Sequence, residues 1–242
     1  MTAELVERRI LGAVAFADAT TGRRIRESLT LGAPSGVRFV RNHSAIYVVT
    51  QTAGLTAFTD AFVPTPALPA PTTLALTVAD PNGTYLPRRF SLNVPRDPTP
   101  AAPLPANSVY SAVTVQLYRA PAAQTLPDWA TVRAHVTRSS ADVGGALVRV
   151  IRKSDTKRIG AGILDERGEA LVIVPGIPLV NWDAGAGPVL ASQIDVTIEA
   201  VFVAPGGSPP DPDALINQAA STSVDAKLGA GGMLTTTLTI PS

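Results

Sequence analysis

The chain has 242 residues, of which 45% are hydrophobic and only 5% aromatic, and it contains no cysteine. Its 20 basic and 19 acidic residues leave a formal net charge of +1. The lack of cysteine excludes disulfides and thiolate metal sites, and the balanced charge argues against binding to nucleic acid or to an anionic membrane surface.

The N-terminus and the hydropathy pattern lead us to expect synthesis in the cytoplasm without a signal peptide. Residues 1–9 carry acidic side chains and no apolar run, unlike a secretory signal. No run approaches the ~18–20 apolar residues of a membrane-spanning helix, so we expect no membrane insertion. Release from the cell as part of a larger particle stays open.

The first half of the chain predicts short strands separated by turns. Apolar and polar residues alternate most clearly in Thr73–Ala79 and Phe90–Val94, and β-propensity is highest in Ala45–Gln51. Asp80–Gly83 is a predicted turn, because Pro81 presets φ and Asn-Gly tolerates positive φ. Further strands are expected at Ile10–Phe16 and Val37–Arg41.

A proline-rich segment separates the two halves. Pro95–Ser108 has proline at five of its fourteen positions, which favours an extended, semi-rigid conformation. We therefore predict an N-terminal sandwich at 1–96, a linker at 97–108 and a C-terminal sandwich at 109–242. A long surface loop inside one sandwich is the alternative.

The clearest pattern in the second half lies between Gly144 and Pro175. Three apolar, β-branched runs cover Ala146–Ile151, Ile159–Leu164 and Ala170–Val174. The first connection, Arg152–Arg158, is charged, and the second, Asp165–Gly168, ends on the glycine that a tight turn needs. These runs predict an antiparallel meander.

The rest of the second half is also mostly strand by pattern. Gln193–Val203 alternates as a half-buried strand, and Met233–Ile240 is a closing strand. Asp213–Leu228 is the one segment that suggests a short helix. Further strands are expected at Ser111–Tyr118 and Thr131–Thr137. The predicted fold class is all-β, with two antiparallel β-sandwich domains of Ig-like or prealbumin-like type.

The central region resembles the carboxypeptidase regulatory-like, transthyretin-like (prealbumin-like) family. The features that carry the resemblance are Gly145–Val150, Gly160-Ala161-Gly162, the turn Asp165–Gly168 and Pro175-Gly176. A fainter likeness runs through Phe16–Gly22, Val37–Val48 and Tyr85–Pro95. Paired sandwiches of this kind are similar to accessory components of contractile, phage-tail-like injection particles. The resemblance implies a non-catalytic structural module.

No residue pattern predicts catalysis. The two histidines, His43 and His135, are far apart in the sequence and lack an acidic partner at ligand spacing. The neighbouring carboxylates Asp165 and Glu166 diverge at a turn and do not form an acid/base pair. Gly229–Gly232 lacks the lysine of a phosphate-binding loop. We expect no enzyme activity, cofactor or metal, although calcium ligation by Asp211, Asp213 and Asn217 stays open.

Protein–protein contact is the predicted mode of action. The candidate interface residues are Arg152, Lys153, Lys157 and Arg158 in the charged hairpin, together with Trp182, since tryptophan is enriched at interface hot spots. Met1–Arg9 and Ala204–Gly232 are candidate docking segments. The leading hypothesis is a structural or adaptor protein in an assembly of other subunits, with homo-oligomerisation open. The alternative is a carbohydrate- or cell-surface-binding module.

Overall fold

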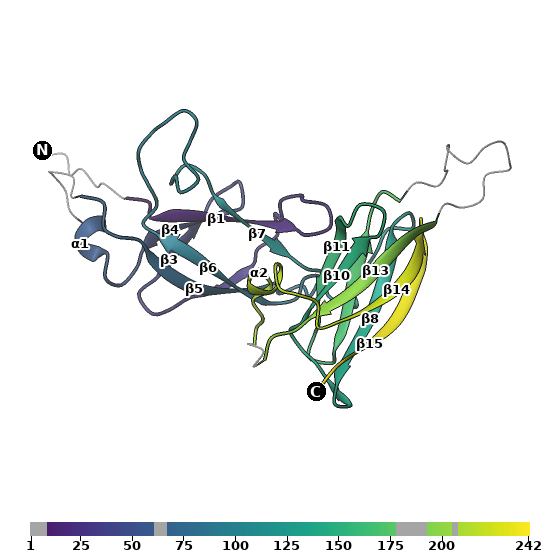
Figure 1. Ribbon diagram of the computed structural model, residues 1–242. Coiled ribbons are helices and arrows are strands. Elements are labelled where there is room, and N and C mark those ends of the chain that lie inside the picture. Colours follow the sequence, from purple (N-terminus) through teal and green to yellow (C-terminus); the bar gives the residue numbers. More distant parts are fainter. Residues whose placement is uncertain (1–8, 61–66, 178–192, 205–207) are drawn as a thin grey trace, which may run out of the picture. The chain divides into compact units, whose positions relative to one another are not determined.

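The computed structural model describes residues 9–60, 67–177, 193–204 and 208–242. Internal contacts divide the chain into two compact units. Described residues of the first unit lie within 1–17, 23–78 and 89–116, and those of the second within 18–22, 79–88 and 117–242. In both units nearly every regular element is a strand (Figure 1), which confirms the predicted all-β class with β-sandwich domains.

The first unit pairs a four-stranded sheet with a three-stranded one. The larger sheet, in the order β3-β4-β1-β7, contains β1 (Gly12–Asp18), β3 (Arg38–Arg41), β4 (Ile46–Gln51) and β7 (Val113–Leu117). The smaller, in the order β2-β5-β6, contains β2 (Thr30–Gly32), β5 (Thr72–Ala79) and β6 (Arg88–Val94). A single-turn helix, α1 (Thr56–Thr59), follows β4.

Aromatic rings hold the two sheets of this unit together. Phe16 of β1 lies edge-on to Tyr47 of β4 and to Phe90 of β6, at centroid distances of 5.5 and 5.7 Å. Because β1 and β6 belong to different sheets, the Phe16–Phe90 contact spans the sandwich. Edge-to-face pairs of this kind add stability beyond the apolar area that they bury.

The second unit is also a sandwich of two sheets. One sheet, β11-β10-β13-β14, is built from β10 (Leu147–Arg152), β11 (Arg158–Ile163), β13 (Gln193–Val201) and β14 (Thr222–Gly229). The other, β12-β8-β15, is built from β8 (Ala130–Arg138), β12 (Glu169–Val174) and β15 (Met233–Ile240), with the short β9 (Ala141–Asp142) paired to β8. A one-turn helix, α2 (Pro212–Leu215), precedes β14.

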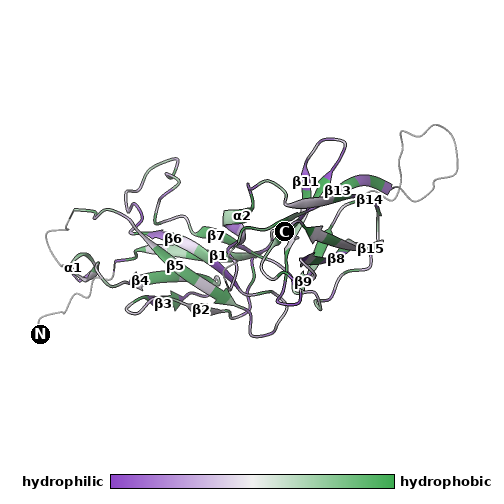
Figure 2. Ribbon diagram, turned by 60° about the horizontal axis from the view of Figure 1, so that its bottom comes forward, coloured by the Kyte–Doolittle hydropathy of each residue, from purple (hydrophilic) through white to green (hydrophobic). Residues whose placement is uncertain are grey.

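The core of the second unit follows from the period-2 pattern of its strands. Val196, Ile198 and Ala200 of β13 are fully buried, whereas the residues between them face outward. Figure 2 shows the same alternation of hydrophobic and hydrophilic residues along β13. These buried side chains meet the inward residues of β8, such as Val132 and Val136, in one cluster between the sheets.

Two glycines allow close approach at one corner of this sandwich. A Cβ on Gly162 of β11 would lie 2.7 Å from the carbonyl oxygen of Leu171, and one on Gly160 would lie 2.9 Å from Val172 Cγ1. Distances this short are not tolerated, so β11 reaches β12 only because both positions lack a side chain. The Gly-x-Gly motif thus has a packing role.

Three expectations about the second unit need correction. The third run of the meander, β12, pairs with β8 in the opposite sheet rather than with β11. The closing strand β15 pairs with β8 in parallel, so not every pairing is antiparallel. The short helix suggested within 213–228 covers only the first turn of that range, α2, which ends at Leu215. Thr222–Leu228 is part of strand β14 instead, because it pairs along β13 and tertiary pairing overrides weak local preference.

The predicted linker at 97–108 lies within the first unit. The backbone N–H of Asp97 donates to the carbonyl of Asn107 (2.9 Å), and that of Val109 donates to the carbonyl of Asp97 (2.8 Å). The ends of this proline-rich segment are therefore hydrogen-bonded to each other. The domain limits 1–96 and 109–242 stay predictions.

Candidate interaction surfaces

The charged hairpin between β10 and β11 is held by ion pairs on its own surface. Arg152 donates two hydrogen bonds to Asp155, at 2.9 and 2.6 Å. These bonds lower the pKa of Asp155 to about 2. Lys153 is paired with Asp225 of β14 at 2.7 Å. Two of the predicted contact residues are thus engaged within the chain, while Lys157 and Arg158 are exposed. Trp182 lies outside the described residues.

The same ion-pair pattern continues across the outer face of this sheet. Lys227 pairs with Asp195 directly across from it, at 3.3 Å. Arg149 pairs with Glu199, also directly across, at 2.7 Å. Opposite charges at facing positions support the register of β10, β13 and β14. The two lysine pairs form a hydrated, charge-balanced surface, which is the ordinary role of such pairs, whereas the Arg149 and Glu199 side chains are only 12% and 23% exposed.

The other half of the outer face is covered by α2 and by Tyr118. Leu147, Ile163 and Val201 project outward yet are almost fully buried, because they pack against Tyr118 and Leu215. Arg149 fastens the chain beyond α2 by donating to the carbonyls of Ile216 and Gln218, both at 3.1 Å. The sheet β11-β10-β13-β14 thus has the main core of the unit on one side and a small second core on the other.

A buried arginine anchors α2. The side chain of Arg88 is 0% exposed and pairs with Asp213, and Asp211 lies 3.7 Å away. The Asp211 carboxylate also caps α2 by accepting from the Asp213 N–H. These two aspartates therefore pair with a buried cation of the chain itself, and the calcium ligation left open for them in the sequence stays untested.

Asp18 holds the turn after β1. Its carboxylate accepts from the backbone N–H groups of Thr20 (2.8 Å) and Thr21 (3.0 Å), from the Tyr85 hydroxyl (2.9 Å) and from Arg119 (2.6 Å). Burial raises the pKa of Asp18, but the hydrogen bonds and the nearby Arg119 charge outweigh burial and leave that pKa lowered. Asp18 is a structural anion.

His135 has an acidic partner that sequence spacing alone did not reveal. Its Nε2 lies 3.0 Å from Asp142 Oδ1 because β9 folds back along β8. Both side chains are about half exposed, and within the described residues no group of three or more His, Asp or Glu side chains is placed to hold a metal ion.

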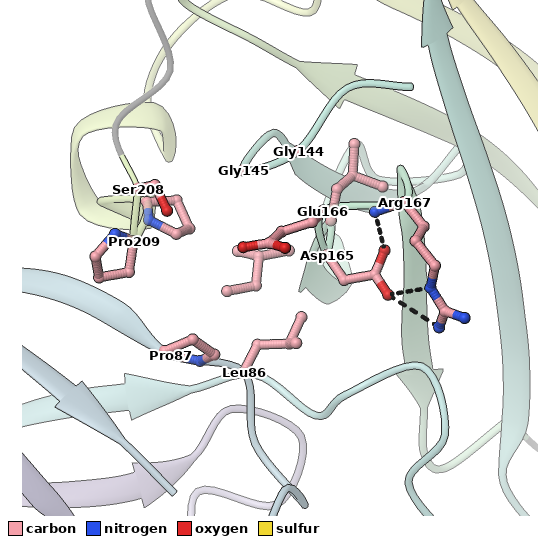
Figure 3. Close-up of a pocket in the computed structure, with 12 residues that line it drawn as sticks. Leu86, Pro87, Gly144, Gly145, Asp165, Glu166, Arg167, Ser208 and Pro209 are labelled. Carbon is pink, nitrogen blue, oxygen red and sulfur yellow. Dashed lines mark hydrogen bonds and ion pairs between the residues drawn. The ribbon is translucent and has the colours of Figure 1, made fainter. Parts of the chain in front are cut away.

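A pocket of about 520 Å³ opens beside the turn Asp165–Gly168. Its lining includes Leu86, Pro87, Ile163 and Pro209. The Glu166 carboxylate points between Ser208–Pro209 and Leu86–Pro87, as Figure 3 shows. Glu166 is an exposed turn residue, as the sequence predicts. The pocket beside it was not predicted, because no sequence signal brings residues 86–87 and 208–210 to the same place.

Strand β15 presents an unpaired edge. It is the last strand in the order β12-β8-β15, and within the described ranges no strand pairs with its other side. The Thr131 N–H donates to the carbonyl of Gly232 (2.9 Å), so the even-numbered residues of β15 bond to β8. The backbone groups of Met233, Thr235, Thr237 and Thr239 therefore face outward, and their side chains are exposed.

No helix within the described ranges has the length and apolar character needed to cross a membrane.

Comparison with known proteins gives only distant likenesses. No family model matches the chain, and no curated protein matches it. Among solved structures, the Bacillus anthracis TIE protein is 9% identical with a TM-score of 0.30, and the match covers 96% of this chain but only 34% of that protein. The minor pilin GBS52 of Streptococcus agalactiae is 7% identical with a TM-score of 0.29, covering 96% of both chains. The shaft pilin SpaA of Lactobacillus rhamnosus GG is 10% identical with a TM-score of 0.27, covering 97% of this chain and 99% of that one.

Proposed function

We propose that this chain is a non-enzymatic structural or adaptor protein that binds other protein subunits through strand addition at β15. The single observation that carries the proposal is the edge of β15, which offers outward N–H and C=O groups over Met233–Ile240. Natural proteins protect such edges with charge, proline or bulges, and Met233–Ile240 contains none of the first two. An unprotected edge invites a partner strand.

The edge of the other sheet provides the contrast. Strand β14 carries Asp225 and Lys227, both engaged in cross-strand ion pairs. Charges on an edge strand disfavour pairing with another chain. Strands β14 and β15, one terminal strand from each sheet, therefore differ in the feature that controls β-augmentation, and of these two β15 is the one suited to a partner.

The kind of assembly is a narrower proposal. The transthyretin-like resemblance and the likeness to components of contractile, phage-tail-like injection particles come from the sequence alone, and no family model supports them. A carbohydrate- or cell-surface-binding module stays the alternative. It would require exposed aromatic side chains, and the chain has only 5% aromatic residues.

Sedimentation of native lysate from the source tests the proposal. We expect the untagged wild-type chain to migrate with particles much heavier than its own 25.0 kDa, together with a repeated set of proteins identified by mass spectrometry. Thr237→Lys places a charge on the exposed edge and should shift the chain to the position of a free protein.

Ser223→Lys is the matched control for that experiment. It adds the same charge at an exposed position of β14, and it should sediment like the wild type. Equal sedimentation of both variants with the heavy particles would show that β15 is not the contact. A wild-type chain that sediments alone at its own mass would overturn the assembly proposal.

A further inference from the structure

The pocket beside the turn Asp165–Gly168 combines an apolar lining with a single available carboxylate. Leu86, Pro87, Pro209 and Pro210 line it, and so do the nearly fully buried Ile163 and Leu164. Gly144 and Gly145 contribute backbone without side chains. No aromatic residue is among the described lining residues. The site is therefore a half-open, mostly apolar pocket of about 520 Å³.

The charged side chains around the pocket differ in whether they already have a hydrogen-bond or ion-pair partner. The Asp165 carboxylate accepts from the backbone N–H groups of Arg167 (2.9 Å) and Glu169 (3.0 Å). The Arg167 side chain pairs with Asp165 (3.2 Å) and Glu169 (3.4 Å), and Figure 3 shows it directed away from Glu166. Within the described residues no hydrogen bond or ion pair holds the Glu166 carboxylate, so the pocket carries one free negative charge.

We propose that this pocket receives a lysine side chain from a partner protein. The four-carbon stem of lysine suits walls of leucine, isoleucine and proline, and its ammonium is a compact charge that one carboxylate can pair with. Arginine could pair with the same carboxylate bidentately, but its larger, planar guanidinium finds no aromatic ring to stack on in these walls, so we expect lysine to be preferred.

The proposal rests on the function proposed above, that the chain works through protein contacts, and it assigns the chemistry of one such contact. The pocket and the β15 edge are formed by different residues, so the proposal about one can be refuted while the proposal about the other stands. A single side chain in a half-open pocket binds weakly by itself, and we expect a dissociation constant in the millimolar range, on the order of 1–10 mM.

The test is a titration of the ¹⁵N-labelled full chain, followed by amide chemical shifts. The probes are acetyl-Leu-Lys-Leu-amide, the same peptide with norleucine in place of lysine, the same peptide with arginine, and n-butylamine. The lysine peptide should shift the amides of Gly144, Gly145 and Glu166. The norleucine and arginine peptides and butylamine should each bind about fivefold more weakly or worse.

Three variants assign the effect to the pocket. Glu166→Gln keeps the size of the side chain and should weaken the lysine peptide about fivefold. Glu169→Gln, which removes a carboxylate that pairs with Arg167 outside the pocket, should leave binding unchanged. Ser208→Phe fills the pocket at its rim and should abolish the shifts. The amide spectrum of each free variant reports whether it is folded.

The outcomes separate cleanly. Equal binding of the lysine and norleucine peptides, or no effect of Glu166→Gln, would overturn the role of the carboxylate. Equal binding of butylamine would assign the pocket to free amines rather than to a partner's side chain. Absence of binding at 20 mM peptide, about twice the weakest constant expected, would overturn the proposal as a whole. A β15 edge that still binds its partner in that case would leave the proposed function intact.

Discussion

Asp18 shows how one buried charge organises a turn in this protein. Its carboxylate is 5% exposed and meets Arg119, Tyr85 and two backbone N–H groups. Asp18→Asn removes the negative charge and leaves the Arg119 guanidinium, 18% exposed, without its counter-ion. We expect the free energy of unfolding at pH 7 to fall by roughly 2–4 kcal/mol. Urea unfolding measures this, and Asp128→Asn, at an exposed position, should change it by less than about 0.5 kcal/mol.

The difference in unfolding free energy between the wild type and Asp18→Asn should depend on pH with a definite sign. The pKa of Asp18 is lower in the folded protein than in the unfolded chain. Its contribution is therefore fully present above the unfolded pKa of about 3.9 and is lost as the pH falls through the folded value. The gap between wild type and Asp18→Asn should be constant from pH 5 to 7 and shrink below about pH 4. A gap that widens in acid would contradict the charge argument.

Arg88 is the corresponding buried cation. It is fully buried and holds Asp213 and Asp211 at the start of α2. Arg88→Met keeps much of the side-chain volume but leaves α2 without its ionic anchor. We expect a loss of about 2 kcal/mol, since the partly exposed aspartates can recover hydration.

Hydrogen exchange distinguishes that local role from a general loss of stability. In Arg88→Met, the amides of residues 211–218 should exchange faster, while those of the core strand β8 should follow the global change alone. Arg89→Met alters the neighbouring exposed position of β6 and serves as the matched substitution. Equal acceleration in both variants would mean that α2 is held by its apolar contacts rather than by the ion pair.

At the level of elements, the corner between β11 and β12 depends on glycine. Gly162→Ala would place a methyl group 2.7 Å from a backbone oxygen of β12, and backbone cannot move aside as a side chain can. We expect a loss of about 1–3 kcal/mol in the free energy of unfolding. Thermal and urea unfolding test this, with Arg158→Ala, at an exposed position of the same strand, as the control. An unchanged midpoint for Gly162→Ala would refute the packing role.

At the level of the whole molecule, acid should destabilise the fold. Besides Asp18, three aspartates nearer the surface have a lowered pKa. The main causes are hydrogen bonds from Thr99 to Asp97, from Arg152 to Asp155 and from Lys153 to Asp225. Because the unfolded chain takes up these protons first, the free energy of unfolding should decline between about pH 4 and pH 2. Unfolding in that range should be accompanied by proton uptake, which calorimetry in buffers of different ionisation enthalpy measures. A free energy of unfolding that rises toward pH 2 would contradict the stabilising role of these aspartate hydrogen bonds.

Local patterns predicted much of the secondary structure and the turns. The alternation predicted in Gln193–Val203 matches β13, which ends two residues earlier at Val201, because a sheet with one buried face imposes a period of two on its strands. The closing strand predicted at Met233–Ile240 is β15. The turn glycines Gly83 and Gly168 have φ values of +69° and +70°, as Asn-Gly and Asp-x-x-Gly predict. These features depend on neighbours in the sequence, which explains why sequence reasoning reached them.

Only the tertiary structure decided which strands pair and which charges meet. Whether β12 continues the sheet of β11 or joins β8 depends on contacts between residues far apart in the sequence, and Ala170–Val174 is buried on both faces, so its own pattern does not decide. The partnership of Arg88 with Asp213, 125 residues away, and the pocket around Glu166 arise in the same way. The sequence by itself determined the all-β class, most strand limits and the turns, because these follow from local backbone preference and period-2 burial. The tertiary structure determined the unprotected edge of β15 and the pocket, because both depend on which distant segments pack together.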